Sequence, residues 1–471
     1  MFVNMFLYVL VNLSRAAVRT IPKALIIFLL FQVCGFPLAP GLLSLYNKVN
    51  VNTVIICEVF MKQTTYAIDN SAILYLALMR RRHTNIYRFT MTMREEVDPD
   101  ILQQAMERIY RRFPTIIAGF RRELLRYRVV PVDAAPLVLP DPGVLIPMNR
   151  KEIESCAYRI FYRGRDISYE GFHAAADGYG AVASFTTLIS EYLRLRHGSE
   201  IPVCSTLRHV DDAPMEHELE DSYLTHQEGK PLHLPSRYAY QLPGVYDEPR
   251  VYPCSRFYHT DAVLAAARKH GVSMTSLLSS IMASAIMDIQ TRHTQKLKPV
   301  RIMVPVDLRK LFGSSTLRNF ILYTLPTMEP GDEHLPLREL AHRFHTQIRE
   351  QLDPKRMAAI MAYNVRAQAN FFFRAIPVGI QCALMRLAYR FFGESNSSIT
   401  LTNLGNIQLP QEMASQLEAI QCIPTPRAGS PYNCSVISLN GRLTITFSRF
   451  CRRPELEAVF FAKLDEVLAA V

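Results

Sequence analysis

The sequence predicts a mixed α/β (α+β) protein built as two lobes. From Met61 onward, segments with the two-residue period of strands alternate with segments that have the wider spacing of helices. A chain of 471 residues, 49% of them hydrophobic, is long enough for two or three domain-sized units or for one large two-lobed protein with a sizeable core. A polar, proline-bearing stretch over 198–250 predicts a connection between the lobes. We therefore expect one lobe over 61–197 and a second over 251–471.

The first lobe is expected to begin with a strand and a helix. Residues 86–93 alternate with period two and predict a strand. Asp98 as cap and Pro99 at the first helical position predict that a helix follows. A further strand region is expected to begin at 113–120, and residues 158–172 predict two short strands around an Arg-Gly-Arg turn.

The second lobe is expected to alternate in the same way. An apolar helix with a Ser/Thr-rich start is predicted over 271–286 and strands over 300–326. Helices are expected from about 337 to 393, followed by closing strands over 399–404 and 433–449.

The stretch 371–392 is apolar with spaced arginines. It fits a helix that lies on a membrane or a helix that lines an apolar substrate channel. It also fits a core helix whose arginines extend outward to solvent. The core helix is the interpretation that we prefer.

A histidine and an aspartate lie four residues apart where a predicted strand gives way to a predicted helix. The segment is Gly171-Phe-His-Ala-Ala-Ala-Asp-Gly178, and an apolar run with few charges follows it. A histidine at a strand end would face a cleft, and its near-neutral pKa suits it to take a proton from an alcohol, amine or thiol. The alternative is a histidine that caps a helix or satisfies a buried hydrogen bond. A second pair with this spacing, His217 and Asp221, lies in an acidic, loop-like stretch and lacks the glycine.

Three later segments follow this motif in a set order. Residues 304–309 predict a strand ending in Arg309, 317–325 follow it, and 399–405 predict a strand with a polar end. With the His-x-x-x-Asp-Gly motif, this order resembles the HxxxDG acyltransferase superfamily of peptide-synthetase condensation domains, alcohol acetyltransferases and chloramphenicol-acetyltransferase-like enzymes. The resemblance covers about residues 62–471. It implies two chloramphenicol-acetyltransferase-like lobes, with mixed sheets flanked by helices and the active site in the cleft between them.

The resemblance also implies a role for each residue of the motif. His173 would be the general base. Asp177 would point away from the substrate and pair with Arg309, which holds the loop in shape. Gly178 would let the backbone turn tightly, and a nearby amide would help to hold the oxyanion.

Three polar residues are candidates for contact with the oxyanion or the acceptor. Asn403, with Thr402, ends the strand that is expected to face the cleft, and Asn319 is the third candidate. For Asn403, a turn residue at a strand end is an equal alternative.

The resemblance implies an acyltransferase that moves an acyl group from a thioester to a small alcohol or amine. The thioester would be acyl-CoA or an acyl-carrier protein, used as co-substrate, with no bound cofactor and no metal. Phe172 stands where many condensation domains have a second histidine, which weakens peptide-bond condensation as the reaction. The chain has no tryptophan, so the plant-type Asp-Phe-Gly-Trp-Gly signature is absent. The rival interpretations are a non-catalytic protein that binds acyl-thioesters and a membrane-associated interaction protein.

Composition limits the partners and the compartment. The net charge of +11 and a pI near 9.2 indicate attraction to anionic partners, such as a thioester donor or a membrane surface, or a generally solvated basic surface. The basic residues are dispersed and no nucleic-acid-binding motif is present, so we expect no nucleic-acid partner. The nine cysteines contain no Cys-x-x-Cys pair, which favours a reducing, cytoplasmic compartment over a disulfide framework or a zinc site.

Residues 1–60 differ in composition from the rest of the chain. The strongest apolar run, 24–36, has the length of a signal-peptide core and is shorter than the roughly 20 residues that span a bilayer. An extension to Tyr46 would be long enough, but Pro37 and Pro40 interrupt it. In a bacterium, Glu58 and Val59 can be encoded by codons that form a ribosome-binding sequence just before the Met61 codon. A misassigned start, a membrane anchor that gives membrane contact, and a cleaved signal therefore remain open.

A chain that begins at Met61 is expected to fold and to be active. The physical reason is the break in composition at Met61, where the resemblance to the superfamily also begins. Thermal unfolding and acyl transfer by the truncated protein would check this. Aggregation of the truncated protein, with the full chain stable only in membranes, would contradict it.

Overall fold

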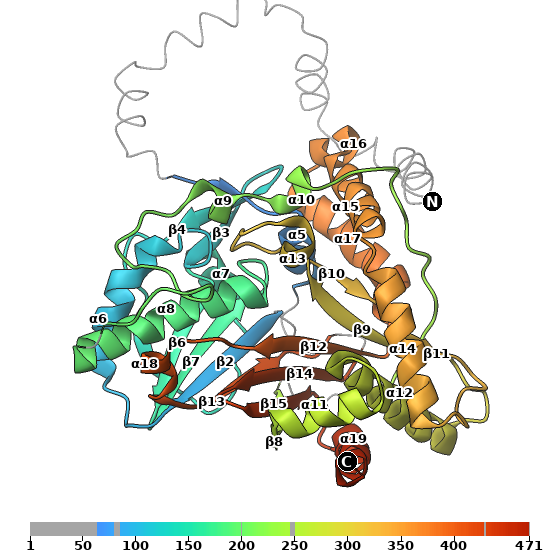
Figure 1. The fold of residues 1–471 in the computed structure, drawn as a ribbon. Coiled ribbons are helices and arrows are strands. Elements are labelled where there is room, and N and C mark those ends of the chain that lie inside the picture. The colour runs from blue at the N-terminus through green and yellow to red at the C-terminus, as the bar shows by residue number, and fades with distance from the viewer. Residues whose placement is uncertain (1–63, 80–84, 199, 245–249, 428–429, 471) are drawn as a thin grey trace, which may run out of the picture. The chain divides into compact units, whose positions relative to one another are not determined.

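Sheets and covering helices alternate along the chain in the computed structural model (Figure 1). The structure describes residues 64–79, 85–198, 200–244, 250–427 and 430–470. The part of the chain from Thr64 onward forms one compact unit. The interpretations given above for residues 1–60 lie outside the described residues.

A five-stranded sheet, in the order β13-β2-β7-β6-β5, organises the N-terminal half of this unit. Its central strand is β7 (Asp166–Phe172), which pairs antiparallel with β2 (Ile86–Met93). The predicted strand and the predicted hairpin are confirmed, and the hairpin turns at Gly164, whose φ of 55° favours glycine. The other strands of this sheet are β5 (Val138–Pro140), β6 (Tyr158–Arg163) and β13 (Leu417–Pro424).

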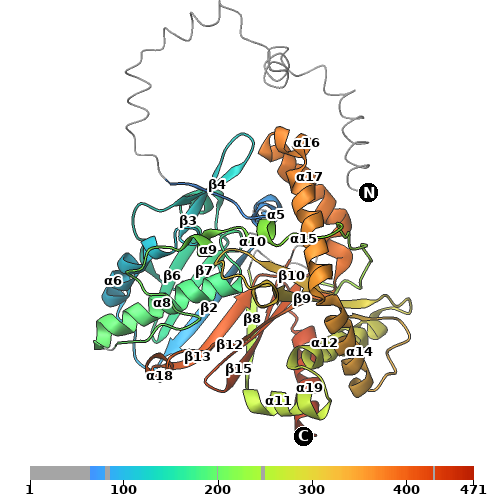
Figure 2. The ribbon, with the colours of Figure 1, turned by 45° about the horizontal axis from the view of Figure 1, so that its top comes forward.

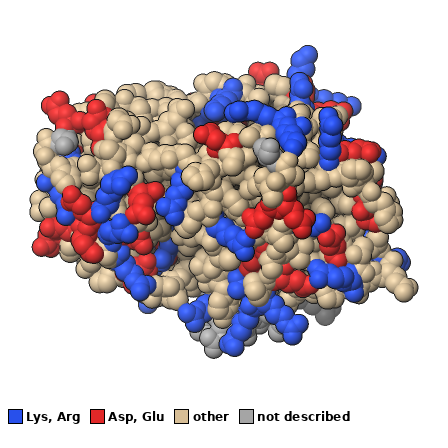
Figure 3. Space-filling model, turned by 60° about the horizontal axis from the view of Figure 1, so that its bottom comes forward, with Lys and Arg blue, Asp and Glu red and all other residues tan. Residues whose placement is uncertain are grey.

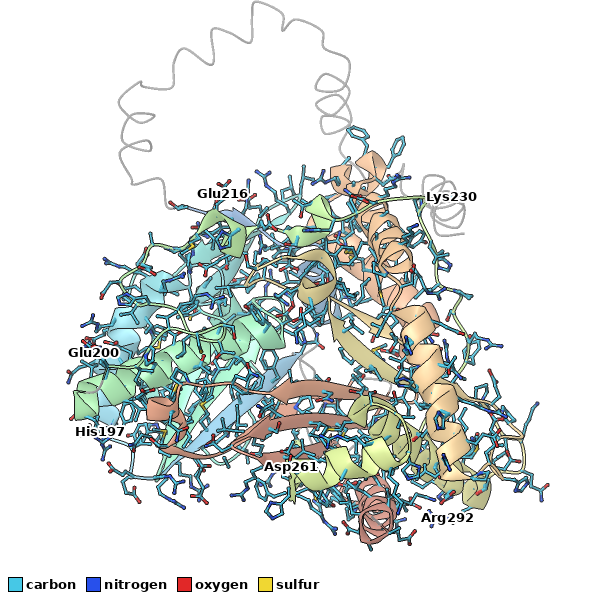
Figure 4. All side chains as sticks on the ribbon, in the orientation of Figure 1. His197, Glu200, Glu216, Lys230, Asp261 and Arg292 are labelled. Carbon is cyan, nitrogen blue, oxygen red and sulfur yellow. The ribbon has the colours of Figure 1, made fainter. Side chains whose placement is uncertain are left out.

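Two helices, α6 (Pro99–Ile109) and α8 (Gly178–His197), supply much of the first core together with this sheet. Asp98 caps α6 as predicted, because its carboxylate accepts the amides of Asp100 and Ile101. The helix α8 ends at His197, labelled in Figure 4, and the following Gly198 has a left-handed φ of 70°.

A small sheet and short helices complete this half. The strand expected from residue 113 begins only at Ala118, because the amides of Ile116 and Ile117 turn back to the carbonyl of Phe113. The remaining elements are β1 (Tyr66–Ala67), α5 (Ala72–Leu78), η1 (Tyr110–Arg112), β3 (Ala118–Arg122), β4 (Tyr127–Pro131) and α7 (Arg150–Ser155).

The connection predicted over 198–250 contains only two short helices among its described residues, α9 (Glu216–Leu219) and α10 (Ser222–Thr225). Glu218 of α9 is buried, and it accepts two hydrogen bonds from Arg112 and one from Arg208. Those arginines lower its pKa to about 2 against the effect of burial. The connection is therefore fixed to the first half by buried ion pairs.

A seven-stranded mixed sheet organises the C-terminal half, with β12 parallel to both of its neighbours β9 and β14. The predicted closing strand over 442–449 is β15. The strands are β8 (Tyr252–His259), β9 (Val300–Asp307), β10 (Ile321–Thr324), β11 (Thr327–Met328), β12 (Ile399–Asn406), β14 (Tyr432–Leu439) and β15 (Arg442–Arg449).

Helices α12 (Met274–His293), α14 (Leu337–Gln351) and α19 (Glu455–Ala469) contribute to a second core with this sheet. Ser273 caps α12, which is buried along most of its length and ends near Arg292, labelled in Figure 4. The other helices of this half are α11 (Thr260–Lys269), α13 (Arg309–Phe312), α15 (Pro354–Ala369), α16 (Phe371–Ala375), α17 (Val378–Phe392), η2 (Glu394–Asn396) and α18 (Gln411–Ala414).

Strand β13 joins the two halves. It pairs with β2 in the first sheet, although it comes from the C-terminal part of the chain. Its backbone carbonyls accept hydrogen bonds from hydroxyls of the second sheet, Ser435 Oγ to Cys422 O at 2.6 Å and Thr444 Oγ1 to Ile420 O at 2.7 Å. Each of these buried hydroxyls finds its hydrogen-bond acceptor only where the two sheets are in contact. The bonds therefore hold the two cores together as one unit.

The preferred interpretation of residues 371–392 as a core helix is wrong. The segment forms two helices, α16 and α17, with Pro377 between them. One face of α17 is covered, at Val378 and Cys382, whereas Ile380 and Leu387 on the other face are 52% and 50% exposed. Spaced arginines occur both in helices that protein covers on most sides and in helices that it covers on one face. Their spacing therefore could not predict how much of α17 is exposed.

Three further findings concern membranes, metals and disulfides. Over the described residues, no single helix has the length and apolarity to cross a membrane; only α11 and α12, bent by 82°, pass that test as a pair. The same residues hold no group of three His, Cys, Asp or Glu side chains that could bind a metal ion. The seven described cysteines are free, and four of them are buried.

Candidate active site

His173 lies directly after strand β7, where the chain turns toward α8. Its backbone amide donates to the carbonyl of Asn85 at 3.0 Å, which fixes the end of the strand. The side chain is half-buried, and its Nδ1 is a buried atom without a hydrogen-bond partner. The strand, loop and helix therefore follow one another as the motif predicted.

Two tyrosines hold the imidazole ring. Tyr75 of α5 stacks on it with a centroid distance of 4.2 Å and an angle of 15° between the planes. Tyr87 of β2 meets the ring edge-on at 5.2 Å, and its hydroxyl donates to the carbonyl of Ala176 in the same loop at 2.9 Å. The ring is thus fixed in orientation by packing rather than by hydrogen bonds.

Burial lowers the pKa of His173 from its ordinary value of 6.5, because the protonated ring loses contact with water. Its own backbone, the Asp177 carboxylate and the Asn319 side chain act in the opposite direction but more weakly. The ring is therefore neutral at neutral pH, which is the form that a general base needs.

The Asp177 carboxylate accepts five hydrogen bonds. Its Oδ1 caps α8 by accepting the amides of Tyr179 at 3.1 Å and Gly180 at 3.2 Å. Two more come from the guanidinium of Arg309, at 2.9 Å and 3.1 Å. The fifth comes from the amide of Phe320 at 2.9 Å. A carboxylate that is 1% exposed is thus fully compensated.

Arg309 uses all of its guanidinium donors. Besides Asp177, it donates to the carbonyl of Thr316 at 2.7 Å, the carbonyl of Arg318 at 2.6 Å and the carboxylate of Asp307 at 2.8 Å. The two carboxylates raise its pKa further against the effect of burial. Through these bonds, Arg309 links the loop after α13 to the loop that carries His173.

Asn319 is fully buried in that loop after α13. Its Nδ2 donates to Asp69 Oδ2 at 3.2 Å and to the carbonyl of Ala174 at 3.3 Å. Its Oδ1 is a buried atom without a partner, like Nδ1 of His173. The structure therefore places Asn319 beside the histidine loop, where it supports the residue next to His173.

Asn403 lies within β12, opposite Val436 and just before the register irregularity that ends at Asn406. Its Oδ1 accepts the amide of Gly405 in the same strand, whose φ is 74°, and its Nδ2 donates to Thr275 Oγ1 at 2.9 Å. The Nδ2 bond holds β12 against α12, and the Oδ1 bond shapes the strand itself. Thr402, one residue earlier and half-buried, pairs with Ser435 in the sheet register.

Glycines 178 and 180 let α8 approach its neighbours. The expected tight turn at Gly178 is wrong, because this residue begins α8 and its φ is not in the left-handed region. A Cβ on Gly178 would lie 2.5 Å from the end of the Leu404 side chain. A Cβ on Gly180 would lie 1.9 Å from the backbone oxygen of Leu317, which leaves no room. Gly180 is therefore the glycine that the packing requires.

Sequence reasoning missed Tyr75 and Asp69. Asp69 is buried and accepts the amide of Ala72 at the start of α5, the helix that carries Tyr75. An aspartate before a helix is a readable capping signal. The stacking of Tyr75 on His173, which is distant in sequence, has no local signal.

A cavity of about 560 Å³ lies outside this site. Residues of β9, β11 and α14 line it, together with Arg237 from the connection. Three of its arginines already have partners, since Arg237 pairs with Glu329, Arg343 with Asp332, and Arg301 with the side chain of Asn396. None of the predicted site residues lines it.

Comparisons with known proteins agree with this geometry. Residues 258–448 match the family model described as phthiocerol/phthiodiolone dimycocerosyl transferase C-terminus. Polyketide synthase associated protein 5 from Mycobacterium tuberculosis is 14% identical, with a TM-score of 0.55, and the match covers 86% of this chain and 98% of that one. The fold is that of the HxxxDG acyltransferase superfamily. Both the resemblance and the mixed α/β class predicted from the sequence are confirmed.

Two further solved structures have the same fold. TRI101 of F. sporotrichioides, solved with coenzyme A and T-2, is 13% identical, with a TM-score of 0.59 and coverage of 85% of this chain and 97% of that one. The nonribosomal peptide synthetase FmoA3 is 16% identical, with a TM-score of 0.53 and coverage of 86% and 43%. No curated protein matches the chain by sequence. At these identities, the solved structures establish the fold alone.

Replacing Gly180 by alanine is expected to destabilise the protein by about 1–3 kcal/mol, because the new Cβ meets a backbone oxygen that cannot move without shifting the loop. Gly178→Ala is the matched control, since the flexible end of Leu404 can move away. Denaturant unfolding of both variants measures the difference. Equal stability of the two would contradict the packing argument.

Replacing Asp177 by asparagine is expected to cost about 3–5 kcal/mol, because Arg309 stays buried with half of its charge compensation gone. Asp307→Asn removes the other carboxylate from the same arginine. That carboxylate is 39% exposed, so we expect a loss below about 1 kcal/mol. Thermal unfolding compares the two, and an unchanged Tm for Asp177→Asn would refute the structural role of the pair.

Proposed function

We propose that this protein transfers an acyl group from a thioester to an alcohol or an amine, with His173 as the general base. The observation that carries the proposal is a half-buried histidine with a lowered pKa, which lies at a strand end next to a loop fixed by a buried ion pair. The superfamily fold and the family match over 258–448 support the same class of reaction. The donor would be acyl-CoA or an acyl-carrier protein.

The burial of Nδ1 supports an assignment of the two ring nitrogens of His173. Because Nδ1 is buried, Nε2 is the nitrogen that would face the substrate. It would take the proton of the acceptor as the acceptor oxygen or nitrogen bonds to the thioester carbonyl carbon. The carbon–sulfur bond would then break, and the imidazolium would return the proton to the leaving thiolate. Atoms and charge balance without a covalent enzyme intermediate.

The other motif residues would support this step without taking part in it. Asp177 donates no proton and accepts none in the reaction, because five hydrogen bonds occupy its oxygens. The amides of Tyr179 and Gly180 are used by the same carboxylate, so they shape the loop rather than hold the oxyanion. Tyr75 would keep the imidazole plane fixed while the proton moves.

The likeness to solved complexes supports both kinds of donor. TRI101 was solved with coenzyme A and a small-molecule acceptor, and FmoA3 belongs to the nonribosomal peptide synthetases. A small alcohol or amine is the acceptor class that a neutral general base suits. The proposal therefore keeps acyl-CoA and the carrier protein as co-substrates and requires no bound cofactor.

His173→Ala is the experiment that tests this function. Acyl transfer is expected to fall by about two to four orders of magnitude, while thermal stability stays close to that of the wild type. His270→Ala is a matched control, because His270 is also half-buried, has a lowered pKa and has an unpartnered Nδ1, but lies at the end of α11. A His173→Ala protein that transfers acyl groups at the wild-type rate would remove the proposal.

The pH dependence of kcat/KM is expected to show an acid limb with a pKa below 6.5. Activity requires the neutral ring, which is present above the pKa of His173, and burial lowers that pKa. Activity should thus persist below pH 6.5 and decline only in more acidic solution. An acid limb at or above 6.5 would show that the reacting base is not this ring.

A further inference from the structure

Helices α16 and α17 form a projecting apolar surface. Figure 1 and Figure 2 both show α16 at the tip of the unit, at the end of the α15 and α17 pair. Phe371 and Phe372 of α16 are 65% and 66% exposed, which is unusual for neighbouring phenylalanines. Large apolar groups gathered at one place on a surface generally mark a binding site.

The turn between β3 and β4 extends this surface. The carbonyl of Leu124 accepts the amide of Val378 at 2.8 Å, and the carbonyl of Leu125 accepts Gln381 Nε2 at 3.0 Å. The two leucine side chains are 73% and 45% exposed. We call the whole set the α16–α17 surface: Leu124, Leu125, Phe371, Phe372, Ile380 and Leu387.

The outer face of α17 repeats the apolar character of its inner face. Val378 and Cys382 are buried against α5, while Ile380 and Leu387 point outward at helical spacing. Exposed apolar residues on a second helix face are typical of a helix that binds a further partner or a membrane on that face. Here only one side has a protein partner among the described residues.

The charge on this segment has one sign. Residues 354–393 contain no aspartate or glutamate, and their basic residues are Lys355, Arg356, Arg366, Arg374, Arg386 and Arg390. The β3–β4 turn adds one acid, Glu123, which pairs with Arg126 and Arg128. On the face drawn in Figure 3, by contrast, Lys and Arg lie beside Asp and Glu. A predominantly basic and aromatic surface is complementary to a surface that is both apolar and anionic.

We propose that the α16–α17 surface docks the protein on an anionic lipid membrane. The phenylalanines and leucines would enter the boundary between headgroups and acyl chains, while Arg374 and Arg390 meet lipid phosphates. The apolar residues 1–60 are a less suitable occupant of this surface, because their four basic residues outnumber their one acidic residue and would be repelled by its arginines. The proposal concerns a binding surface and is independent of the proposed function.

The position of this surface relates it to the candidate site. Helix α17 packs on α5, whose Tyr75 stacks on His173. Burial raises the pKa of Tyr75, with smaller contributions from Tyr223, Asp177 and Asp69 and the smallest from Tyr389 of α17, which therefore lies near it. Docking through α16 would therefore place the membrane on the α17 side of the site.

A fluorescent reporter tests the docking directly, because the chain has no tryptophan. Phe371→Trp in the full chain is expected to shift its emission to shorter wavelength with phosphatidylcholine–phosphatidylglycerol vesicles and to be quenched by brominated acyl chains. Phe257→Trp is the matched control, since Phe257 is 49% exposed on β8, away from α16 in Figures 1 and 2. It should show neither effect.

Two variants test the apolar and the basic parts separately. Phe371→Ser with Phe372→Ser should weaken vesicle binding by at least about tenfold, since each lost aromatic ring removes a full apolar side chain from the interface. Arg374→Gln with Arg390→Gln should lower binding to anionic vesicles and leave binding to pure phosphatidylcholine unchanged.

Several results would overturn the proposal. One is an unchanged Phe371→Trp spectrum with anionic vesicles. Another is equal binding of wild type to neutral and anionic vesicles. A third is a dimer in size-exclusion chromatography that Phe371→Ser with Phe372→Ser converts to a monomer, which would make this surface an interface between two copies. Retained activity of that variant would show that the proposed function stands without the docking.

Discussion

The ion pair between Asp177 and Arg309 is the interaction on which the rest of the site depends. The carboxylate caps α8, accepts the amide of Phe320 and holds a guanidinium that in turn binds three other groups. Neither charge can be buried alone, so the histidine loop and the loop after α13 must fold together. The amide bond to Asn85 and the packing of Tyr75 and Tyr87 position His173 itself, and the ion pair fixes the loop that follows it.

The elements of this site that are local in sequence could be predicted. The hairpin that leads to His173 and the change from strand to helix at the motif follow from short-range signals, and the structure has both, whereas the cap of α8 by Asp177 was not predicted. Arg309 was placed beside Asp177 through its position in the motif order. The assumed reason for Gly178 was wrong, because close packing against Leu404, and not a turn, acts there.

The parts that could not be predicted depend on contacts between distant segments. Tyr75 stacks on His173 only after α5 is fixed by Asp69, and no periodicity in that short segment indicates it. Strand β13 enters the first sheet because hydroxyls of Ser435 and Thr444 meet its carbonyls, which a pattern of apolar residues does not record. The exposure of α17 was missed for the same reason, since periodicity does not show whether a second partner covers a helix.

The central claim is that an acyl group passes directly from thioester to acceptor while His173 carries the proton. Intact-mass measurement of the protein mixed with an acyl-CoA, with and without an alcohol or amine acceptor, tests it most directly. The account predicts an unchanged protein mass in both cases, with acylated acceptor and free thiol formed only when the acceptor is present. An acyl adduct on the protein that forms without acceptor and disappears when acceptor is added would contradict it.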